Sequence, residues 1–301
     1  MNDIWRIPSR VDAFAGPPAP RTAPEPEIDA RFSILGRGEG WAVVSKSGNI
    51  PCHPSGRYRR NTLETLLRET AGFQQVHFVS RLDRETSGCV LVATDPQTAG
   101  ILGKSLMARR IAKTYFCVVR GQWRRPCDSA GLFSARGWIC PAGDDIVRKY
   151  RIFIPASTDS SVSASPQFEI LPSGAQEAET VFRALPWTSL GSDAKEAATL
   201  DAARLVALEC RPVTGRTHQI RATLRALGME VVGDKLYGPD RAIYGRMCDG
   251  RMTPADVAAL KIKRQALHAW RIRFRDPSTG ADIQLEAPPD DLLLEIRRAF
   301  S

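Results

Sequence analysis

One apolar run preceded by a dense polar segment constrains the fold of this chain more than any other stretch. The run Cys89–Ala93 has the length and composition of a strand that is buried on both faces. The preceding segment, Arg81–Gly88, carries the carboxylate Asp83 and ends in glycine, which tolerates positive φ. Arg81 and Arg84 flank Asp83 and are expected to hold its pKa below the ordinary value. Taken alone, such a loop is more often a structural salt bridge than a catalytic site.

Composition favours a protein that binds a polyanion. The chain has 301 residues, of which 43% are hydrophobic, enough for one large domain or two small ones. Its formal charge of +9 makes the phosphate backbone of a nucleic acid the first candidate partner, although a basic solvated surface would look the same. The seven cysteines are odd in number and have no Cys-x-x-Cys spacing, which argues against a disulfide framework and a zinc site. Reduced cysteines, no signal-like start and no apolar run of membrane-spanning length predict a cytoplasmic protein without a membrane partner.

Two further polar segments lie far downstream, Gly215–Arg221 (GRTHQIR) and Gly233–Gly238 (GDKLYG). The first stands at the start of an expected helix, where a turn with free amide groups is a natural anion site. His218 within it is more readily interpreted as a buried structural histidine than as a general base.

The segments Arg81–Gly88 (RLDRETSG) and Gly215–Arg221 resemble the signatures of the RluA-type pseudouridine synthases. The order of the weaker matches is also that of the family, and the resemblance spans roughly residues 36 to 290. These weaker matches are Trp41–Lys46, Pro51–Pro54, Lys113–Tyr115, Gly233–Gly238 and Leu267–Ala269.

The resemblance implies an enzyme that isomerises specific uridines of structured rRNA or tRNA to pseudouridine. It assigns the catalytic carboxylate to Asp83, stacking on the target base to Tyr115, and pairing with the carboxylate to Arg221. Since the base must leave its stack to reach a loop carboxylate, base flipping is implied. The reaction involves no redox change, so no cofactor or metal is expected. Further substrate contacts are expected from Arg81, Thr86, Arg216, Thr217, His218, Gln219, Ile220 and Leu224, with Ile220 and Leu224 as the floor of the pocket.

A weaker expectation concerns the basic loop around Tyr58. Arg57, Arg59 and Arg60 surround this tyrosine, and arginines beside an aromatic ring can contact phosphates and stack on bases. An ordinary basic surface loop explains the same residues equally well.

The resemblance implies an α+β fold, with a mixed, largely antiparallel sheet, flanking helices and a central RNA-binding cleft. Residues 1–30 are rich in proline and predict an extended arm, and residues 31–301 form the expected catalytic domain. Periodicity predicts strands over 41–45, 89–93, 113–119, 205–211 and 268–274, and helices over 62–69, 96–108, 218–227 and 290–300. We expect a monomer with no obligatory protein partner.

The chain departs from the family pattern at two positions. Ser80 and Thr223 stand where the family usually has histidine, which affects fine positioning and substrate choice more than reaction class. Two other functions stay open. A nucleoside or glycoside hydrolase would need a second carboxylate, for which Glu85 is the nearest candidate. An RNA-binding protein that has lost activity would keep the basic cleft.

Overall fold

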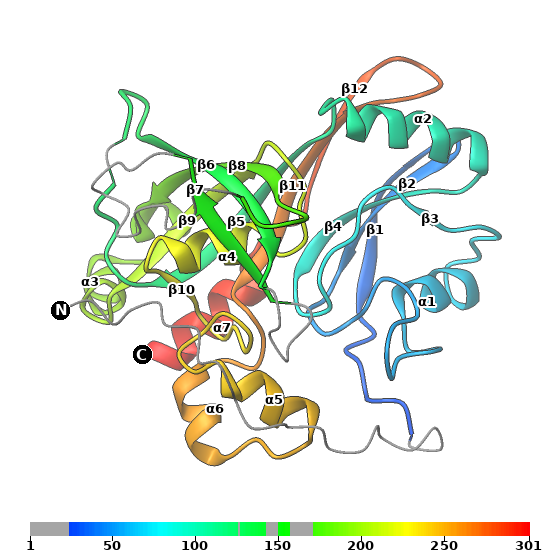
Figure 1. Ribbon diagram of the computed structural model, residues 1–301. Helices are drawn as coiled ribbons and strands as arrows, with labels where there is room; N and C mark the ends of the chain where they lie inside the picture. The colour runs from blue at the N-terminus through cyan, green and yellow to red at the C-terminus, as the bar shows by residue number, and fades with distance from the viewer. Residues whose placement is uncertain (1–23, 126, 143–149, 157–170) are drawn as a thin grey trace.

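The strands of the computed structural model join into one sheet, which Figure 1 shows crossing the molecule. The structure describes residues 24–125, 127–142, 150–156 and 171–301. The strands are β1 (Phe32–Gly38), β2 (Trp41–Lys46), β3 (His77–Phe78), β4 (Ser87–Ala93), β5 (Ala112–Arg120), β6 (Leu132–Pro141), β7 (Arg151–Pro155), β8 (Gln176–Leu185), β9 (Leu205–Pro212), β10 (Glu230–Val231), β11 (Leu267–Arg275) and β12 (Asp282–Glu286).

The sheet is mixed and largely antiparallel, which confirms the expected fold class. Its main path runs β1-β2-β4-β11-β5-β9-β8-β6-β7, with β3 paired to β4, β10 to β5 and β12 to β11. Among the described strands, only β4 and β11 pair in parallel. In Figure 1, β11 runs between the half that contains β1 to β4 and the half that contains β5 to β9.

The helices lie around this sheet, as Figure 1 shows. Within the described part of the chain, no helix has the length and apolar character needed to cross a lipid bilayer. The helices are α1 (Leu63–Glu69), α2 (Pro96–Met107), the short 3₁₀ helix η1 (Trp187–Leu190), α3 (Ala194–Ala202), α4 (Gln219–Ala226), α5 (Ala242–Cys248), α6 (Pro254–Leu260) and α7 (Asp290–Phe300).

The predicted elements correspond closely to the observed ones. Asp95 caps α2 by accepting a hydrogen bond from the Thr98 amide at 2.8 Å, as its position before a first-turn proline predicts. The helix expected over 218–227 is shorter, because His218 adopts the left-handed conformation with φ of 57°. A left-handed residue cannot continue a right-handed helix, so α4 begins at Gln219.

Strands β2 and β4 are buried on both faces, as expected for the run Cys89–Ala93. Alternate side chains point to opposite faces of a strand. Val44 and Val92 pack with Leu67 of α1 in a smaller cluster, whereas Val43 and Leu91 belong to the main core, which extends across β5 and β9. Every residue of β4 is buried, so the polar loop that leads into this strand is anchored at its end to a rigid element.

At the centre of the sheet the starts of β4 and β11 lie beside the first half of β5. Ser87 of β4 pairs with His268 of β11, and Tyr115 of β5 lies opposite Ala269 of β11. Gly88 has a φ of 101°, and a side chain here would collide with the backbone of Ala269. The expectation that this glycine occupies a special backbone position is therefore confirmed.

His268 has a structural role. Its Nε2 lies 2.7 Å from the Ala287 carbonyl, and its Nδ1 lies 2.7 Å from the Ser87 hydroxyl. Burial lowers the pKa of His268 to about 4, so the ring is neutral near pH 7 and ties β4 to β11 as an uncharged link.

Part of the predicted arm can be followed. Residues 1–23 lie outside the described residues. Beyond them the Glu25 carboxylate accepts hydrogen bonds from the Arg60 and Asn61 amides, and the Asn61 side chain donates to the Pro26 carbonyl at 2.9 Å. The segment from Pro24 to Ala30 has no helix or strand and is tied to the loop before α1.

Helix α7 offers a direct test of the core. Leu292 is completely buried in the main cluster, whereas Leu294 on the same helix is 46% exposed. We expect Leu292→Ala to lower the free energy of unfolding by about 2–5 kcal/mol, because it removes apolar contacts and leaves a cavity. Leu294→Ala should change it by less than about 0.5 kcal/mol. Urea unfolding of both variants measures the difference, and equal losses would contradict the described packing of α7.

Candidate active site

A cavity of about 670 Å³ opens where β4 and β11 begin and β9 ends, beside the first half of β5. Asp83 enters it from the loop before β4, Tyr115 from β5, and Arg221 from the first turn of α4. These are the three residues expected to be catalytic. Although 138 positions separate Asp83 and Arg221 in the sequence, the fold brings them into contact.

Arg221 binds two carboxylates at once. Its Nη1 donates to Oδ2 of Asp83 at 2.7 Å, while Nε and Nη2 donate to the two oxygens of Asp234 at 2.6 and 2.8 Å. Asp234 is completely buried, and its Oδ1 also accepts from the amides of Leu236 and Tyr237. This fork leaves the guanidinium little freedom, so the position of Asp83 depends on Asp234 as well as on Arg221.

Asp83 is held in its ionised form. Burial by itself raises the pKa of the carboxyl, but the charge of Arg221, the nearby His218 and hydrogen bonds from Arg221 and Gln265 outweigh it, and the pKa lies below its ordinary value. The expected direction is confirmed, but the expected cause is wrong. Arg81 and Arg84, its neighbours in sequence, turn their guanidinium groups to other partners.

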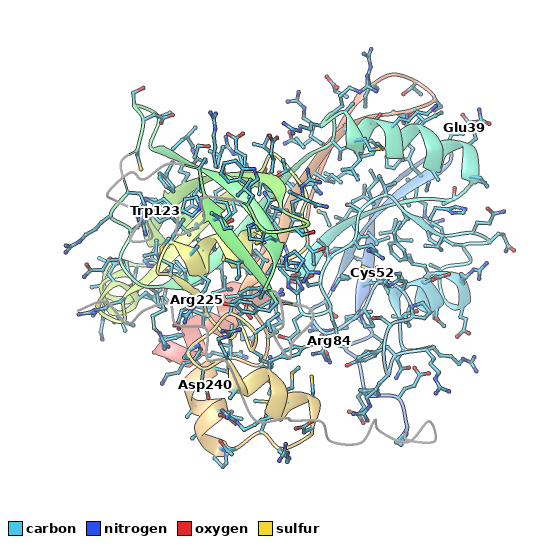
Figure 2. The ribbon with its side chains drawn as sticks, in the orientation of Figure 1. Glu39, Cys52, Arg84, Trp123, Arg225 and Asp240 are labelled. Atoms are coloured by element: carbon cyan, nitrogen blue, oxygen red, sulfur yellow. The ribbon has the colours of Figure 1, made fainter. Side chains whose placement is uncertain are left out.

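Arg84 and Glu85 hold the loop that carries Asp83 in place. Nη1 of Arg84 donates to Asn49 Oδ1 at 2.8 Å and to the Tyr58 hydroxyl at 2.7 Å. Glu85 accepts from Arg84 and from Lys235, both at 2.9 Å. Figure 2 shows Arg84 in the middle of the molecule, between the part of the ribbon that carries α1 and the part that carries α5.

Two side chains also donate hydrogen bonds to the backbone of this loop. The ammonium group of Lys46 donates to the Arg84 carbonyl at 3.1 Å, and the Cys52 thiol donates to the Leu82 carbonyl at 3.6 Å. Burial lowers the pKa of Lys46 to about 8. The carboxylate of Asp83 is thus presented by a loop whose carbonyls on both sides are bound.

His218 lies on the other side of Asp83. Its Nε2 is 3.7 Å from Asp83 Oδ1, and its Nδ1 is 3.0 Å from the hydroxyl of Tyr237, which itself accepts a hydrogen bond from the Arg151 amide. Burial, followed by the charge of Arg221, lowers the pKa of His218 to about 4. The ring is therefore neutral near pH 7 and is oriented by the side chain of Tyr237.

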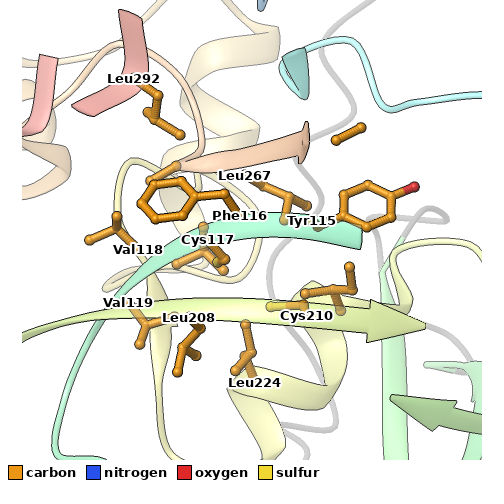
Figure 3. Packing of buried hydrophobic residues seen from close by; sticks show 14 of the residues in the cluster. Tyr115, Phe116, Cys117, Val118, Val119, Leu208, Cys210, Leu224, Leu267 and Leu292 are labelled. Atoms are coloured by element: carbon orange, nitrogen blue, oxygen red, sulfur yellow. The ribbon is translucent and has the colours of Figure 1, made fainter. Parts of the chain in front are cut away.

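Tyr115 forms one wall of the cavity. Figure 3 shows its ring at the edge of the buried cluster, with the hydroxyl directed away from the cluster. The side chain is 8% exposed, and burial together with the Asp83 carboxylate raises the pKa of the hydroxyl well above the ordinary value. The phenol therefore stays protonated at all physiological pH values, and its ring offers a flat apolar surface to a ligand beside Asp83.

Most of the other predicted contact residues line the cavity. Arg81, Thr86, Arg216, Thr217 and Ile220 line the cavity together with His218 and Gln219. Gln219 is buried and already saturated, because its amide group bonds Thr214, Thr180 and two backbone groups.

Leu224 does not line the cavity. It is completely buried in the main core, one helical turn beyond Ile220 and farther from the helix start that faces the cavity. Of the two residues expected at the floor of the pocket, only Ile220 lines the cavity. Arg57, Arg59 and Arg60 are exposed and lie outside the cavity. Tyr58 between them packs against Arg84, whose guanidinium carbon lies 5.5 Å from the centroid of the tyrosine ring.

Ser80 and Thr223, the two departures from the family pattern, lie in different environments. Ser80 lines the cavity, whereas Thr223 is 1% exposed on α4. The Thr223 hydroxyl is one of the few buried polar side-chain atoms in the described part of the chain without a hydrogen-bond partner.

Sequence reasoning missed two residues of the site. Asp234 and Gln265 hold Arg221 and Asp83, and neither was proposed from the sequence. Asp234 lies within the segment Gly233–Gly238, and the match of that segment to the family pattern was the signal that could have identified it. Gln265 gave none, because it reaches the site only through the parallel pairing of β11 with β4, where its side chain donates to Thr86.

Several known proteins have sequences similar to that of this chain. The profile of the RNA pseudouridylate synthase family matches residues 40–226, which include Asp83, Tyr115 and Arg221. The mitochondrial tRNA pseudouridine(32) synthase of Saccharomyces cerevisiae is 29% identical over 252 residues, 82% of this chain and 46% of that protein. Pseudouridylate synthase RPUSD2 of Homo sapiens is 27% identical over 73% of this chain and 34% of its own length. The chain thus spans less than half the length of these two relatives.

Another relative is matched over most of its length. Ribosomal large subunit pseudouridine synthase C of Pasteurella multocida is 29% identical over 99% of this chain and 77% of its own. Two solved structures share the fold: human RNA pseudouridylate synthase domain containing 1, at 22% identity and a TM-score of 0.57, and domain containing 4, at 19% and 0.60. They cover 91% and 88% of this chain, and 98% and 92% of their own chains. Since the family profile covers well over half of the sequence, the chain belongs to the RNA pseudouridylate synthase family.

Proposed function

We propose that the protein isomerises uridine to pseudouridine in structured RNA, with Asp83 as the catalytic carboxylate. The observation that carries this proposal is an ionised carboxylate, fixed by Arg221 at 2.7 Å, beside the apolar ring of Tyr115 in a cavity rich in basic side chains. Membership of the family and the names of the relatives support the same activity.

The isomerisation breaks the bond between ribose C1′ and N1, turns the base, and joins C1′ to C5. N1 gains a proton and C5 loses one, so the composition of the nucleotide is unchanged. Asp83 acts on the ribose or the base as a nucleophile, or removes a ribose proton, and each role requires the ionised form that Arg221 maintains. Tyr115 covers the flipped base, and Ile220 contacts it from the floor of the cavity.

A hydrolase is less well supported. A glycosidase of the usual kind needs two cooperating carboxylates. Asp83 and Glu85 are the two that line the cavity in the described part of the chain, and Glu85 is bound by Arg84 and Lys235. The second carboxylate is therefore already neutralised by two cations.

The substrate is either ribosomal or transfer RNA, since the relatives include synthases named for each. The net charge of +9 supports binding to the phosphate backbone, to which we assign the exposed Arg57, Arg59 and Arg60. Arg81, which contacts His53 at 2.5 Å in the free protein, would fill the space that the base vacates. We further propose a monomeric cytoplasmic enzyme, with residues 31–301 as catalytic domain and residues 1–30 as an arm.

Release of tritium from C5 tests the reaction and the role of Asp83. We expect the protein to release tritium from [5-³H]uridine-labelled rRNA or tRNA of cells that lack its gene. Asp83→Asn should abolish release, because the amide has the shape of the carboxylate but neither its charge nor its basicity. RNA binding should persist, since affinity comes mainly from phosphate contacts. A folded Asp83→Asn protein that still releases tritium would refute the assignment, and the absence of release by the native protein would refute the function.

Arg221 should control the pH dependence of the reaction. In the native protein the pKa of Asp83 lies below its ordinary value, so the single-turnover rate should have no acid limb above about pH 5. Arg221→Gln removes the main charge that opposes the effect of burial, so the pKa should rise and the acid limb should move toward neutral pH. Arg225→Gln, one turn along α4 and paired with Glu230, is the matched control and should leave the profile unchanged. Two superimposable profiles for the Arg221 and Arg225 variants would contradict this electrostatic role.

Substitutions at Tyr115 separate its ring from its hydroxyl. Tyr115→Phe keeps the ring and should bind RNA as the native protein does, whereas Tyr115→Ala should weaken binding by about 1–3 kcal/mol, as expected for loss of one base stack. Equilibrium binding measured with both variants in the Asp83→Asn protein excludes any effect of turnover. If the alanine variant binds as tightly as the phenylalanine variant, the ring does not stack on the base.

A further inference from the structure

The cavity contains a partly buried ammonium group that the protein itself leaves without a partner. Lys113 is only partly exposed, and its ammonium group makes no hydrogen bond or ion pair within the described part of the chain. Most other basic side chains of the cavity are occupied. Their partners are His53 for Arg81, Glu85 for Arg84 and Lys235, the Glu177 carbonyl for Arg216, and Asp83 and Asp234 for Arg221.

The environment of Lys113 also lacks a compensating charge. Burial is the single influence on its pKa, which lies below the ordinary lysine value. Lys46 is buried as well, but its ammonium group bonds the carbonyls of Ser47 and Arg84. Because an unpaired ammonium group loses hydration without compensation, an anion beside Lys113 would be stabilised.

The position of Lys113 relates it to the base. It precedes Tyr115 by two residues in β5, so both side chains leave the same face of the strand. Its Nζ reaches the loop between β9 and α4, where a Cβ added to Gly215 would lie only 3.7 Å away. Since residue 215 has no side chain, the ammonium group stays open to the cavity on that side.

The cavity also has exposed apolar side chains. Met107 is 86% exposed and Val213 is 37% exposed, and both line the cavity together with Lys113. An ammonium group beside exposed apolar side chains suits a nucleotide, which combines an anionic phosphate with a flat apolar base.

We propose that Lys113 binds the phosphate group next to the uridine whose base lies against Tyr115. The ammonium group donates a hydrogen bond to a non-bridging phosphate oxygen and thereby aligns the ribose with Asp83. This inference rests on the proposed function for the nature of the ligand. It assigns to the cavity a phosphate site separate from the residues that contact the base and the catalytic carboxylate.

Mononucleotides test the proposal without any need for turnover. The dissociation constants of uridine, uridine 5′-monophosphate, uridine 3′-monophosphate and inorganic phosphate are measured by NMR titration at low salt. We expect at least one of the two nucleotides to bind the native protein about ten- to a hundredfold more tightly than uridine, the range for a hydrogen bond between charged groups. Lys113→Met should abolish this advantage and leave the affinity for uridine unchanged, and Lys113→Arg should retain it.

Two further variants control for charge and for folding. Lys104→Met removes an exposed lysine of α2 outside the cavity and should retain the phosphate advantage. Gly215→Val keeps the charge of Lys113 but covers its ammonium group, and should reduce the advantage. Lys113→Met should unfold at the same or a higher temperature, because it removes a charge that has no partner.

Several outcomes would overturn the proposal. One is a phosphate advantage that persists in Lys113→Met, and another is an equal loss of affinity for uridine, which would indicate a contact with the base. Inorganic phosphate that binds as tightly as the nucleotides would indicate a general anion site. A lower unfolding temperature of Lys113→Met would make Lys113 structural. Because binding is measured directly, a protein that binds these phosphates through Lys113 but releases no tritium would refute the proposed reaction and leave this site standing.

Discussion

The fork of Arg221 between Asp83 and Asp234 is the interaction on which the site depends. One guanidinium group satisfies a carboxylate that faces the cavity and another that is completely buried. Removal of one member of such a buried group costs about 3–5 kcal/mol, because the partners stay buried without compensation. The same contact therefore supports the fold and keeps Asp83 ionised and immobile, which a catalytic carboxylate requires.

The register of the central strands explains why this fork forms where it does. Ser87 of β4 lies beside His268 of β11, so the loops before these strands meet and Gln265 reaches Thr86. Tyr115 of β5 lies opposite Cys210 near the end of β9, which leads directly into the loop before α4. Arg221 on the first turn of α4 thus comes within 2.7 Å of a carboxylate in a different part of the sequence.

The cations around the cavity serve different purposes. Arg84 and Lys235 hold the loop that carries Asp83 to its surroundings, and Arg221 keeps Asp83 charged. Within the described part of the chain Lys113 has no such structural partner, which distinguishes a side chain available to a ligand from those that the fold already uses. A basic composition alone does not reveal this division, since each of these residues adds the same unit of charge.

Local pattern predicted the strands β2, β4, β5, β9 and β11 and the helices α1, α2, α4 and α7, and the family resemblance added the fold class and the residues Asp83, Tyr115 and Arg221. The run Cys89–Ala93 identified β4 because a strand buried on both faces must be continuously apolar. The resemblance also paired Arg221 with Asp83, and tertiary structure alone decided the other contacts around that pair. The sequence suggested Arg81 and Arg84 as the source of the lowered pKa of Asp83, but Arg221 supplies that charge and Asp234 holds Arg221 in place. The physical reason is that electrostatic effects depend on distance in space, and contacts between residues more than a hundred positions apart follow from strand register, which local pattern does not specify.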